Sequence, residues 1–241
     1  MKKYFLSIAV CLLFVCAVVI GIRVSAQSES VGSALPSPNL VISQFQAGGA
    51  ANANDEFIEI HNNGATAVDL NGYRVVYRSA AGTNDVGPMA AWTTPTMIQP
   101  GQYMLIASTS YDGGVAFDVE YNPTSCACSM GAAGGGLAIR LGDNNTGTII
   151  DSIGWGTATN AFVETTAATV PGNDNSKARA GNGCTDTDNN SADFATLTPA
   201  AARNSSSPLT VCSGGGTTLF AAMTANPSTV IPGGSTLLTV T

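Results

Sequence analysis

Short apolar segments, each ended by glycine, asparagine or proline, repeat along most of the chain. Their residues alternate between apolar and polar or are β-branched, which is typical of strands with one buried face. The expected strands are 40–45, 56–61, 68–70, 73–78, 97–98, 103–107, 137–141 and 148–155. No window after the N-terminal segment shows the 3.6-residue period of a helix. The sequence therefore predicts an all-β fold, an antiparallel β-sandwich of seven or eight short strands.

The charge pattern excludes several classes of function. Charged residues make up 10% of the chain, against about 25% in ordinary globular proteins. The chain has nine basic and sixteen acidic residues. It therefore lacks the excess of basic residues that binds nucleic acid, and no nucleic-acid partner is expected. His61 is the single histidine, which rules out a histidine-rich metal site and leaves one residue for any Ser-His-Asp triad. We expect no catalytic residues and no enzyme activity in this chain.

The first 26 residues have the composition of an export signal. Lys2 and Lys3 precede an apolar run over 4–22, and Val24-Ser25-Ala26 supplies a small-x-small exit. We expect a signal peptide over 1–26, cleaved after Ala26, and a secreted or cell-surface protein. The alternative is a retained anchor, since about 20 apolar residues span a bilayer, and it would be the chain's only contact with a membrane. Cleavage would remove three of the nine basic residues and none of the acidic ones, leaving a net charge of −10.

Four cysteines lie outside this leader: Cys126, Cys128, Cys184 and Cys212. In an exported protein an even number of cysteines predicts disulfides. A Cys126–Cys128 bridge would close a very tight ring, so pairings that join this loop to the later segment are favoured. A zinc site is the alternative, but the Cys-x-Cys spacing does not fit the usual zinc motifs.

Composition divides the chain into five parts. A Ser- and Pro-containing linker over 27–38 follows the leader, and the β-sandwich is expected over 39–206. A Ser/Gly-rich linker over 207–217 comes next. Residues 218–241 contain two strand patterns around Pro232-Gly233-Gly234 and are expected to be the truncated start of a second immunoglobulin-like domain.

Six blocks of sequence in this order carry a family resemblance: 41–45, 55–62, 68–73, 98–106, 137–142 and 150–156. Together with a closing segment at 186–194, they resemble the lamin tail domain family in its bacterial secreted form. The resemblance implies an immunoglobulin-like antiparallel β-sandwich that acts as a non-catalytic module. Residues 219–241 look like the start of a bacterial immunoglobulin-like repeat.

One acidic stretch has a spacing suited to calcium. Asp186, Asp188, Asn190 and Asp193 place four side-chain oxygens within eight residues, and Ca²⁺ binds six to eight oxygen ligands. Ser191 and Leu197 depart from the EF-hand pattern, so a loop that caps the sandwich is the alternative. Calcium is the only cofactor that we consider.

Other candidates are weaker. Glu56 and Glu59 are three residues apart in a strand and should face opposite sides, which argues against a paired acid site. Trp155 is expected in the core, whereas Trp92, in a loop, could stack on a sugar ring. The leading hypothesis is a secreted or cell-surface interaction module of a larger protein, with an extracellular protein or polysaccharide as partner. The competing hypothesis is an accessory domain of an extracellular hydrolase, of nuclease or phosphatase type, whose catalytic part lies beyond residue 241.

Overall fold

The computed structural model describes residues 39–212, 224–226 and 237–239. The expected signal peptide, the 27–38 linker and most of the expected second domain lie outside these residues. Within the described part of the chain, no helix is long and apolar enough to cross a membrane.

Strands account for most of the regular structure, and the three helical elements are single turns of four residues. The strands are β1 (Val41–Ala47), β2 (Glu56–His61), β3 (Val68–Asp69), β4 (Tyr73–Ser79), β5 (Val86–Ala91), β6 (Met97–Ile98), β7 (Tyr103–Ser108), β8 (Val119–Tyr121), β9 (Gly134–Leu141), β10 (Thr148–Gly156), β11 (Ser176–Arg179), β12 (Phe194–Leu197), β13 (Thr224–Asn226) and β14 (Leu237–Thr239). The helical turns are α1 (Pro123–Cys126), η1 (Ala180–Gly183) and α2 (Asn190–Asp193).

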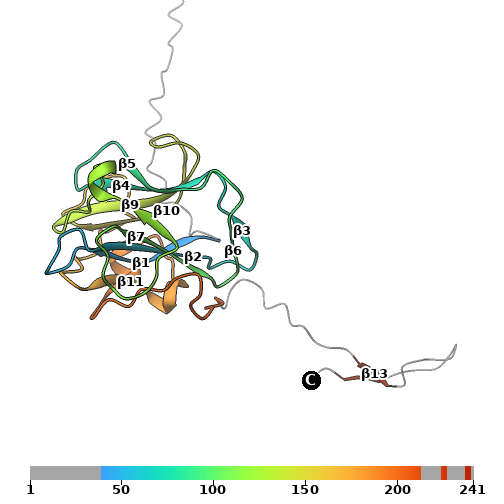
Figure 1. Cartoon of the computed structure of the whole chain (residues 1–241). Helices are drawn as coiled ribbons and strands as arrows, with labels where there is room; N and C mark the ends of the chain where they lie inside the picture. The colour runs from blue at the N-terminus through green and yellow to red at the C-terminus, as the bar shows by residue number, and fades with distance from the viewer. Residues whose placement is uncertain (1–38, 213–223, 227–236, 240–241) are drawn as a thin grey trace, which may run out of the picture. The chain divides into compact units, whose positions relative to one another are not determined.

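Two sheets stack face to face (Figure 1). The large sheet has the order β12-β11-β1-β2-β7-β8, and the small sheet has the order β10-β9-β4-β5. All neighbouring strands are antiparallel except β7 and β8, which are parallel. The predicted antiparallel immunoglobulin-like β-sandwich is therefore confirmed, with one parallel pair at an edge.

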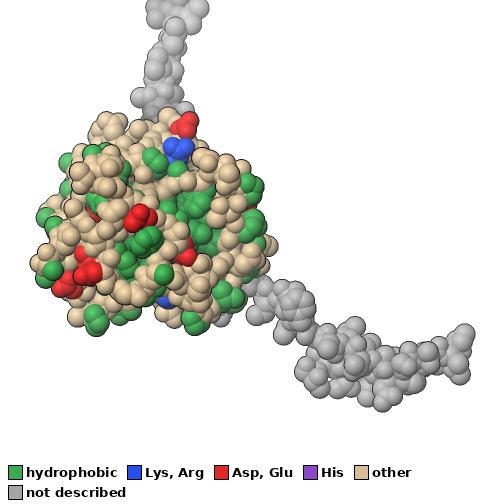
Figure 2. All heavy atoms as spheres, in the orientation of Figure 1, with side chains coloured by type: hydrophobic (Ala, Val, Ile, Leu, Met, Phe, Trp, Pro, Cys, Tyr) green, Lys and Arg blue, Asp and Glu red, His purple; other side chains and the backbone are tan. Residues whose placement is uncertain are grey.

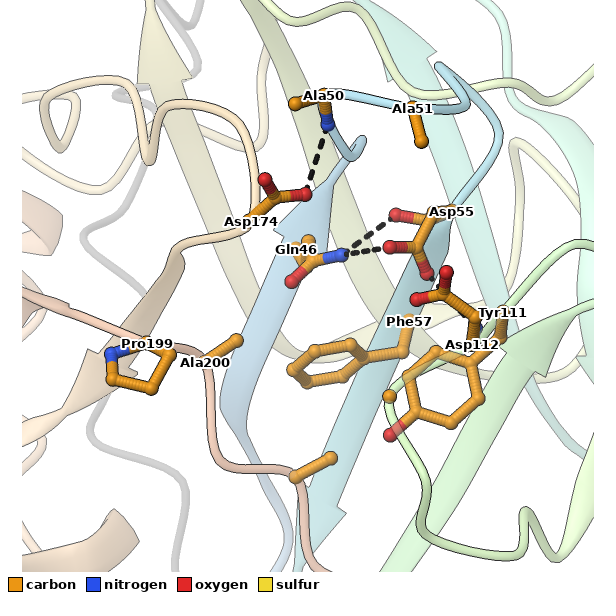
Figure 3. Close-up of a pocket in the computed structure, with 12 residues that line it drawn as sticks. Gln46, Ala50, Ala51, Asp55, Phe57, Tyr111, Asp112, Asp174, Pro199 and Ala200 are labelled. Carbon is orange, nitrogen blue, oxygen red and sulfur yellow. Dashed lines mark hydrogen bonds between the residues drawn. The ribbon is translucent and has the colours of Figure 1, made fainter.

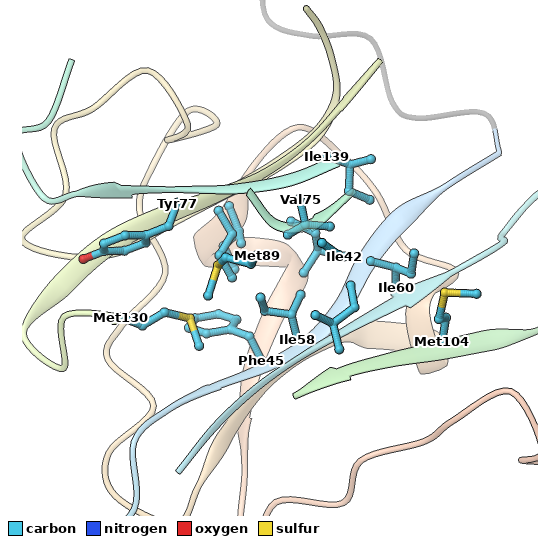
Figure 4. Close-up of a cluster of buried hydrophobic side chains, with 14 of the residues drawn as sticks. Ile42, Phe45, Ile58, Ile60, Val75, Tyr77, Met89, Met104, Met130 and Ile139 are labelled. Atoms are coloured by element: carbon cyan, nitrogen blue, oxygen red, sulfur yellow. The ribbon is translucent and has the colours of Figure 1, made fainter. Parts of the chain in front are cut away.

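Apolar side chains between the sheets form one continuous core (Figure 4). Trp155 is fully buried and packs on Phe45, with ring centroids 4.6 Å apart. Its predicted place in the core is confirmed. Trp92 also belongs to the core and is 8% exposed, so its proposed role in sugar stacking is wrong. Trp92 is held there because its backbone N–H donates to Tyr73 O at the start of β4.

The outer face of the large sheet is covered by the chain that follows β12. Arg203 reaches Glu59 on β2 through three hydrogen bonds of 2.6–3.2 Å. Its guanidinium lies 3.8 Å from the ring centroid of Tyr103 on β7. Nearby, Ala200 and Ala202 pack against a small apolar cluster around Phe57. Both faces of the large sheet are thus buried, which explains why every residue of β1, β2 and β7 is buried.

The disulfides pair Cys126 with Cys128 and Cys184 with Cys212. The expected pairing between the Cys126/Cys128 loop and the later segment is therefore wrong, and the tight ring is formed. The two cysteine pairs lie at opposite ends of β2. Cys126 and Cys128 come shortly before Met130, whose N–H donates to Glu56 at the first residue of β2. Cys212 comes shortly after Thr210, whose carbonyl accepts from His61 at the last residue of β2. Because a six-residue strand is about 17 Å long, cysteines at its two ends cannot meet at disulfide distance.

Beyond residue 212, β13 and β14 pair as a two-stranded antiparallel sheet. They fall within the segment expected to begin a second immunoglobulin-like domain, and that assignment stays a prediction.

Candidate functional site: an acidic groove

A surface groove of about 420 Å³ opens where four loops meet on the outer side of the large sheet (Figure 3). These loops are the β1–β2 hairpin, the turn after β7, the turn before β11 and the segment after β12. We call it the acidic groove. Its lining combines three carboxylates, Asp55, Asp112 and Asp174, with Gln46, Phe57, Tyr111, Pro199 and small residues at 50, 51, 113, 200 and 202.

The β1–β2 hairpin places Asp55 at the groove. Gly48 adopts a φ of 142°, and a side chain there would lie 2.9 Å from Ala53 O, so this tight bend requires glycine. Gly49 N and Asp55 N both donate to Asn52 O, which closes the hairpin tip. Asp55 then accepts a 3.0 Å hydrogen bond from Gln46 Nε2 on the neighbouring strand.

The turn after β7 adds an aromatic ring and a second carboxylate. Tyr111 N donates to Ser108 O, and its ring packs against the Phe57 ring in a T-shaped arrangement at a centroid distance of 5.7 Å. Asp112 N donates to Asp55 Oδ1 at 3.3 Å, which draws the two aspartates together. Figure 3 shows both carboxylates beside the two aromatic rings.

The third carboxylate, Asp174, comes from the turn that leads into β11. Its backbone has a φ of 57°, in the left-handed region that aspartate tolerates better than most residues. Asp174 Oδ1 accepts from Ala50 N at 2.8 Å, and its carbonyl accepts from Ala200 N at 3.2 Å. Asp174 therefore ties the hairpin to the C-terminal segment across the groove.

The electrostatics of the groove are negative. Burial, together with repulsion from Asp112, raises the pKa of the Asp55 carboxyl above its ordinary value of 3.8. Burial and the charge of Asp55 likewise raise the pKa of Tyr111. Among residues 39–212, no lysine or arginine forms an ion pair with Asp55, Asp112 or Asp174. The groove is therefore suited to a cationic ligand with an apolar part.

The interior carboxylates, by contrast, are committed to the fold. Glu56 and Glu59 face opposite sides of β2, as predicted: Glu56 accepts from Tyr121 Oη and Met130 N, and Glu59 accepts from Ser43 and Arg203. Burial raises the pKa of Glu56 to about 7. His61 Nε2 donates to Thr210 O at 3.0 Å, and burial lowers the pKa of its ring.

A second buried cluster surrounds Arg179 between the sheets. Its guanidinium donates two hydrogen bonds to Asp151 and one to Asp186, at 2.8–3.0 Å, while its Nε donates to Ile42 O. Oxygens of Asp151, Glu164 and Asp186 lie within 4.8 Å of one another. Burial and the charge of Asp151 raise the pKa of Glu164 to about 8. Arg179 thus neutralises carboxylates from several segments and connects β10 to β1 and β11.

Two of the four residues of the calcium hypothesis meet at Arg179, whose Nη1 lies 2.9 Å from Asp186 Oδ1 and 3.5 Å from Asp193 Oδ2. Asp193 also accepts from Thr187 N and Oγ1. Asn190 accepts from Gly154 N and donates to Ser152 O, so its amide pairs with the outer edge of β10 as a strand would. Asp188 is buried and has a φ of 54°. Calcium binding by these residues stays a prediction.

No pattern in the sequence points to the three groove carboxylates as a site. Asp112 and Asp174 stand in turn sequences, Asp-Gly-Gly and Asn-Asp-Asn, and Asp55 stands at the start of a strand block. Each is an ordinary turn residue where it stands, and no spacing links the three. Only the approach of the four loops brings them together.

The stacked sheets and the structural use of the interior charges define an immunoglobulin-like β-sandwich domain. A family model, the Lamin Tail Domain, matches residues 33–157, which is more than half of the chain. The chain therefore belongs to the lamin tail domain family, whose immunoglobulin-like domains are not known as catalytic.

The crystal structure of a DUF4876 family protein from Bacteroides thetaiotaomicron is similar over 74% of this chain and 75% of that chain, with a TM-score of 0.47 and 14% identity. A search of curated proteins gave no match.

Proposed function

We propose that this chain is a secreted or cell-surface interaction module of a larger protein, with no catalytic role of its own. One contrast carries the proposal. Glu56, Glu59 and His61 are buried and bonded to the fold's own groups. The carboxylates of the acidic groove line a surface hollow, with Asp112 and Asp174 exposed and Asp55 buried beneath them, and they have no basic partner among the described residues. Unbalanced charge beside apolar walls is typical of a recognition site.

Export is supported by the cysteines and by the leader. Four cysteines form two disulfides, and such bonds persist in oxidising compartments outside the cytosol. The basic and apolar residues of segment 1–26 would direct the chain there. Acidic side chains outnumber basic ones on the face seen in Figure 2, as suits a soluble or surface-displayed domain.

The test is expression of the full chain in a bacterial host. We expect a mature N-terminus at Gln27, no free thiols after denaturation without reductant, and access of added protease to the protein in intact cells or medium. Retention in the cytoplasm with free thiols would contradict export. Hydrolysis of nucleic acid or phosphate esters that disappears when the purified chain is unfolded would contradict the non-catalytic assignment and favour the hydrolase hypothesis.

A further inference from the structure

The acidic groove lacks a counter-charge because the basic side chains of the described residues are engaged elsewhere. The arginines at 74, 78, 140, 179 and 203 each form an ion pair with an acidic residue outside the groove. Lys177 donates to two threonine hydroxyls, those of Thr169 and Thr196. No basic side chain of the described residues is therefore left to pair with the three groove carboxylates. A cation that pairs with them comes from another molecule or from residues outside the described part of the chain.

Two of the carboxylates converge on one small space. A side chain on Gly49 would lie 2.7 Å from Asp55 Oδ2 and 2.9 Å from Asp174 Oδ1. These two oxygens therefore lie within about 6 Å of each other, on either side of Gly49, so their negative charges act on the same part of the groove. Asp112 adds a third negative charge next to Asp55.

Apolar surface lies beside this anionic end. Phe57 and Tyr111 form one wall, and Pro199, Ala200 and Ala202 belong to the segment on the other side (Figure 3). An aliphatic stem can lie between these walls while its charged head reaches the carboxylates, because lysine and arginine stems are apolar along most of their length.

The acidic groove continues into a neighbouring hollow, so the surface is larger than one side chain needs. A second hollow of about 430 Å³ shares Tyr111 and Asp112 with the groove and is lined further on by Val115, Ala116 and Phe117. Phe117 is 42% exposed, so its ring is accessible to a ligand in this hollow. An extended polypeptide can present a basic residue to the groove and an apolar neighbour to Phe117, which a free amine cannot do.

We propose that the acidic groove binds a lysine or arginine side chain of a partner polypeptide. The charged group lies between Asp55, Asp112 and Asp174, and the stem lies on Phe57 and Tyr111. The proposal rests on the function proposed above and names the chemistry of the partner. Its affinity should fall with rising salt, because Asp112 and Asp174 are exposed to solvent.

The experiment measures fluorescence anisotropy of labelled decapeptide pools with the exported, oxidised chain. One pool carries a fixed central lysine with randomised apolar and small neighbours, and the matched pool carries norleucine, which keeps the stem and lacks the charge. We expect the lysine pool to bind at least about tenfold more tightly, in line with loss of a charge-assisted hydrogen bond. Equal binding of the two pools, or no binding of either, would overturn the proposal.

Variants locate the site. Asp112→Asn and Asp174→Asn each remove one groove charge, and asparagine suits the left-handed backbone at 174. The matched control is Asp143→Asn, which removes an exposed charge that pairs with Arg74 outside the groove. We expect each groove variant to weaken binding of the lysine pool several-fold and the control to leave it unchanged. Equal effects of all three variants would show a nonspecific charge effect and overturn the site.

Two further measurements distinguish the reasons for a negative result. Competition by free n-butylamine at the same concentrations as the peptide pool would assign the groove to small amines and overturn the polypeptide partner. Circular dichroism of each variant shows whether the fold is retained, and a misfolded variant is replaced by Tyr111→Ala, for which we expect weaker binding of both pools. Because export, disulfide formation and hydrolysis are measured independently, loss of peptide binding would overturn the acidic groove as the recognition site and leave the exported, non-catalytic assignment standing.

Discussion

Replacing Glu56 by glutamine should remove a large part of the pH dependence of folding. Glu56 is fully buried at the start of β2, accepting hydrogen bonds from Tyr121 Oη at 2.9 Å and Met130 N at 2.7 Å. Burial raises the pKa of its carboxyl from 4.5 to about 7, the hydrogen bonds offsetting only part of this cost. Between pH 4.5 and about 7 the Glu56 carboxyl is therefore protonated in the native state and ionised in the unfolded chain.

The sign and size follow from proton linkage. The stability that the raised pKa contributes is fully present below pH 4.5 and is lost as the pH rises through about 7. A shift of about 2.5 pKa units corresponds to about 3 kcal/mol. Glutamine resembles the protonated acid in shape and cannot ionise. Glu56→Gln should therefore match the parent near pH 4 and exceed its free energy of unfolding by up to about 3 kcal/mol near pH 8.

Urea unfolding followed by the fluorescence of buried Trp92 and Trp155 measures the difference across this pH range. Glu120→Gln is the control, because Glu120 lies exposed on β8 and its replacement removes the same charge without any burial. Parallel curves for parent and Glu56→Gln at all pH values would refute the reasoning. So would a variant that is less stable than the parent near pH 8.

Three further outcomes are expected. Asn190→Ala should lower the free energy of unfolding by about 2–4 kcal/mol in urea titrations, because it leaves the buried Gly154 and Glu164 N–H groups without acceptors. Replacing Cys184 and Cys212 together by serine should cost about 3–4 kcal/mol in the same assay, since the bond closes a loop with a sequence separation of 28. Millimolar calcium should leave the thermal midpoint unchanged, because oxygens of Asn190 and Asp193 already accept from N–H and O–H donors. A clear calcium-dependent rise, monitored by circular dichroism, would support the calcium hypothesis.

The strands that the sequence predicts are those with two-residue alternation, and β2, β4, β7 and β9 fall close to their expected positions. Alternation is a local signal, set by one buried face, and it needs no knowledge of the partner strand. β5 carries Gly87-Pro88 in its centre and lacks the pattern, and β11 and β12 lie among asparagine- and glycine-rich turns. Their pairing is decided by contacts distant in sequence, such as those of Lys177 with Phe45 and Thr196.

The acidic groove and the burial of Trp92 both depend on tertiary structure. Asp55 and Asp112 are 57 residues apart and meet only because β2 and β7 are neighbours. Trp92, expected at the surface of a loop, is buried because the short β3–β6 pair turns the chain back over the core. Neither outcome leaves a trace in the local sequence.

The Cys184–Cys212 bond determines how the domain would respond to mechanical tension. A pulling force applied to the chain beyond Cys212 passes across the sulfurs to Cys184, one turn after β11 ends, and bypasses the residues between them. Because β11 runs antiparallel to β1, this point lies at the same end of the strand pair as Leu40, where an N-terminal force enters. The load would open the β1–β11 hydrogen bonds one after another instead of shearing them together.

The Cys184–Cys212 bond also reduces the length that the domain gains when it is pulled from both ends. The closed loop withholds 28 residues, roughly 90–100 Å of extended chain, from any lengthening under force. Ala200 and Ala202, which line the acidic groove, belong to this loop and carry no load. A domain tethered at both ends could therefore yield at β1 while the loop that bears one wall of the groove remains closed.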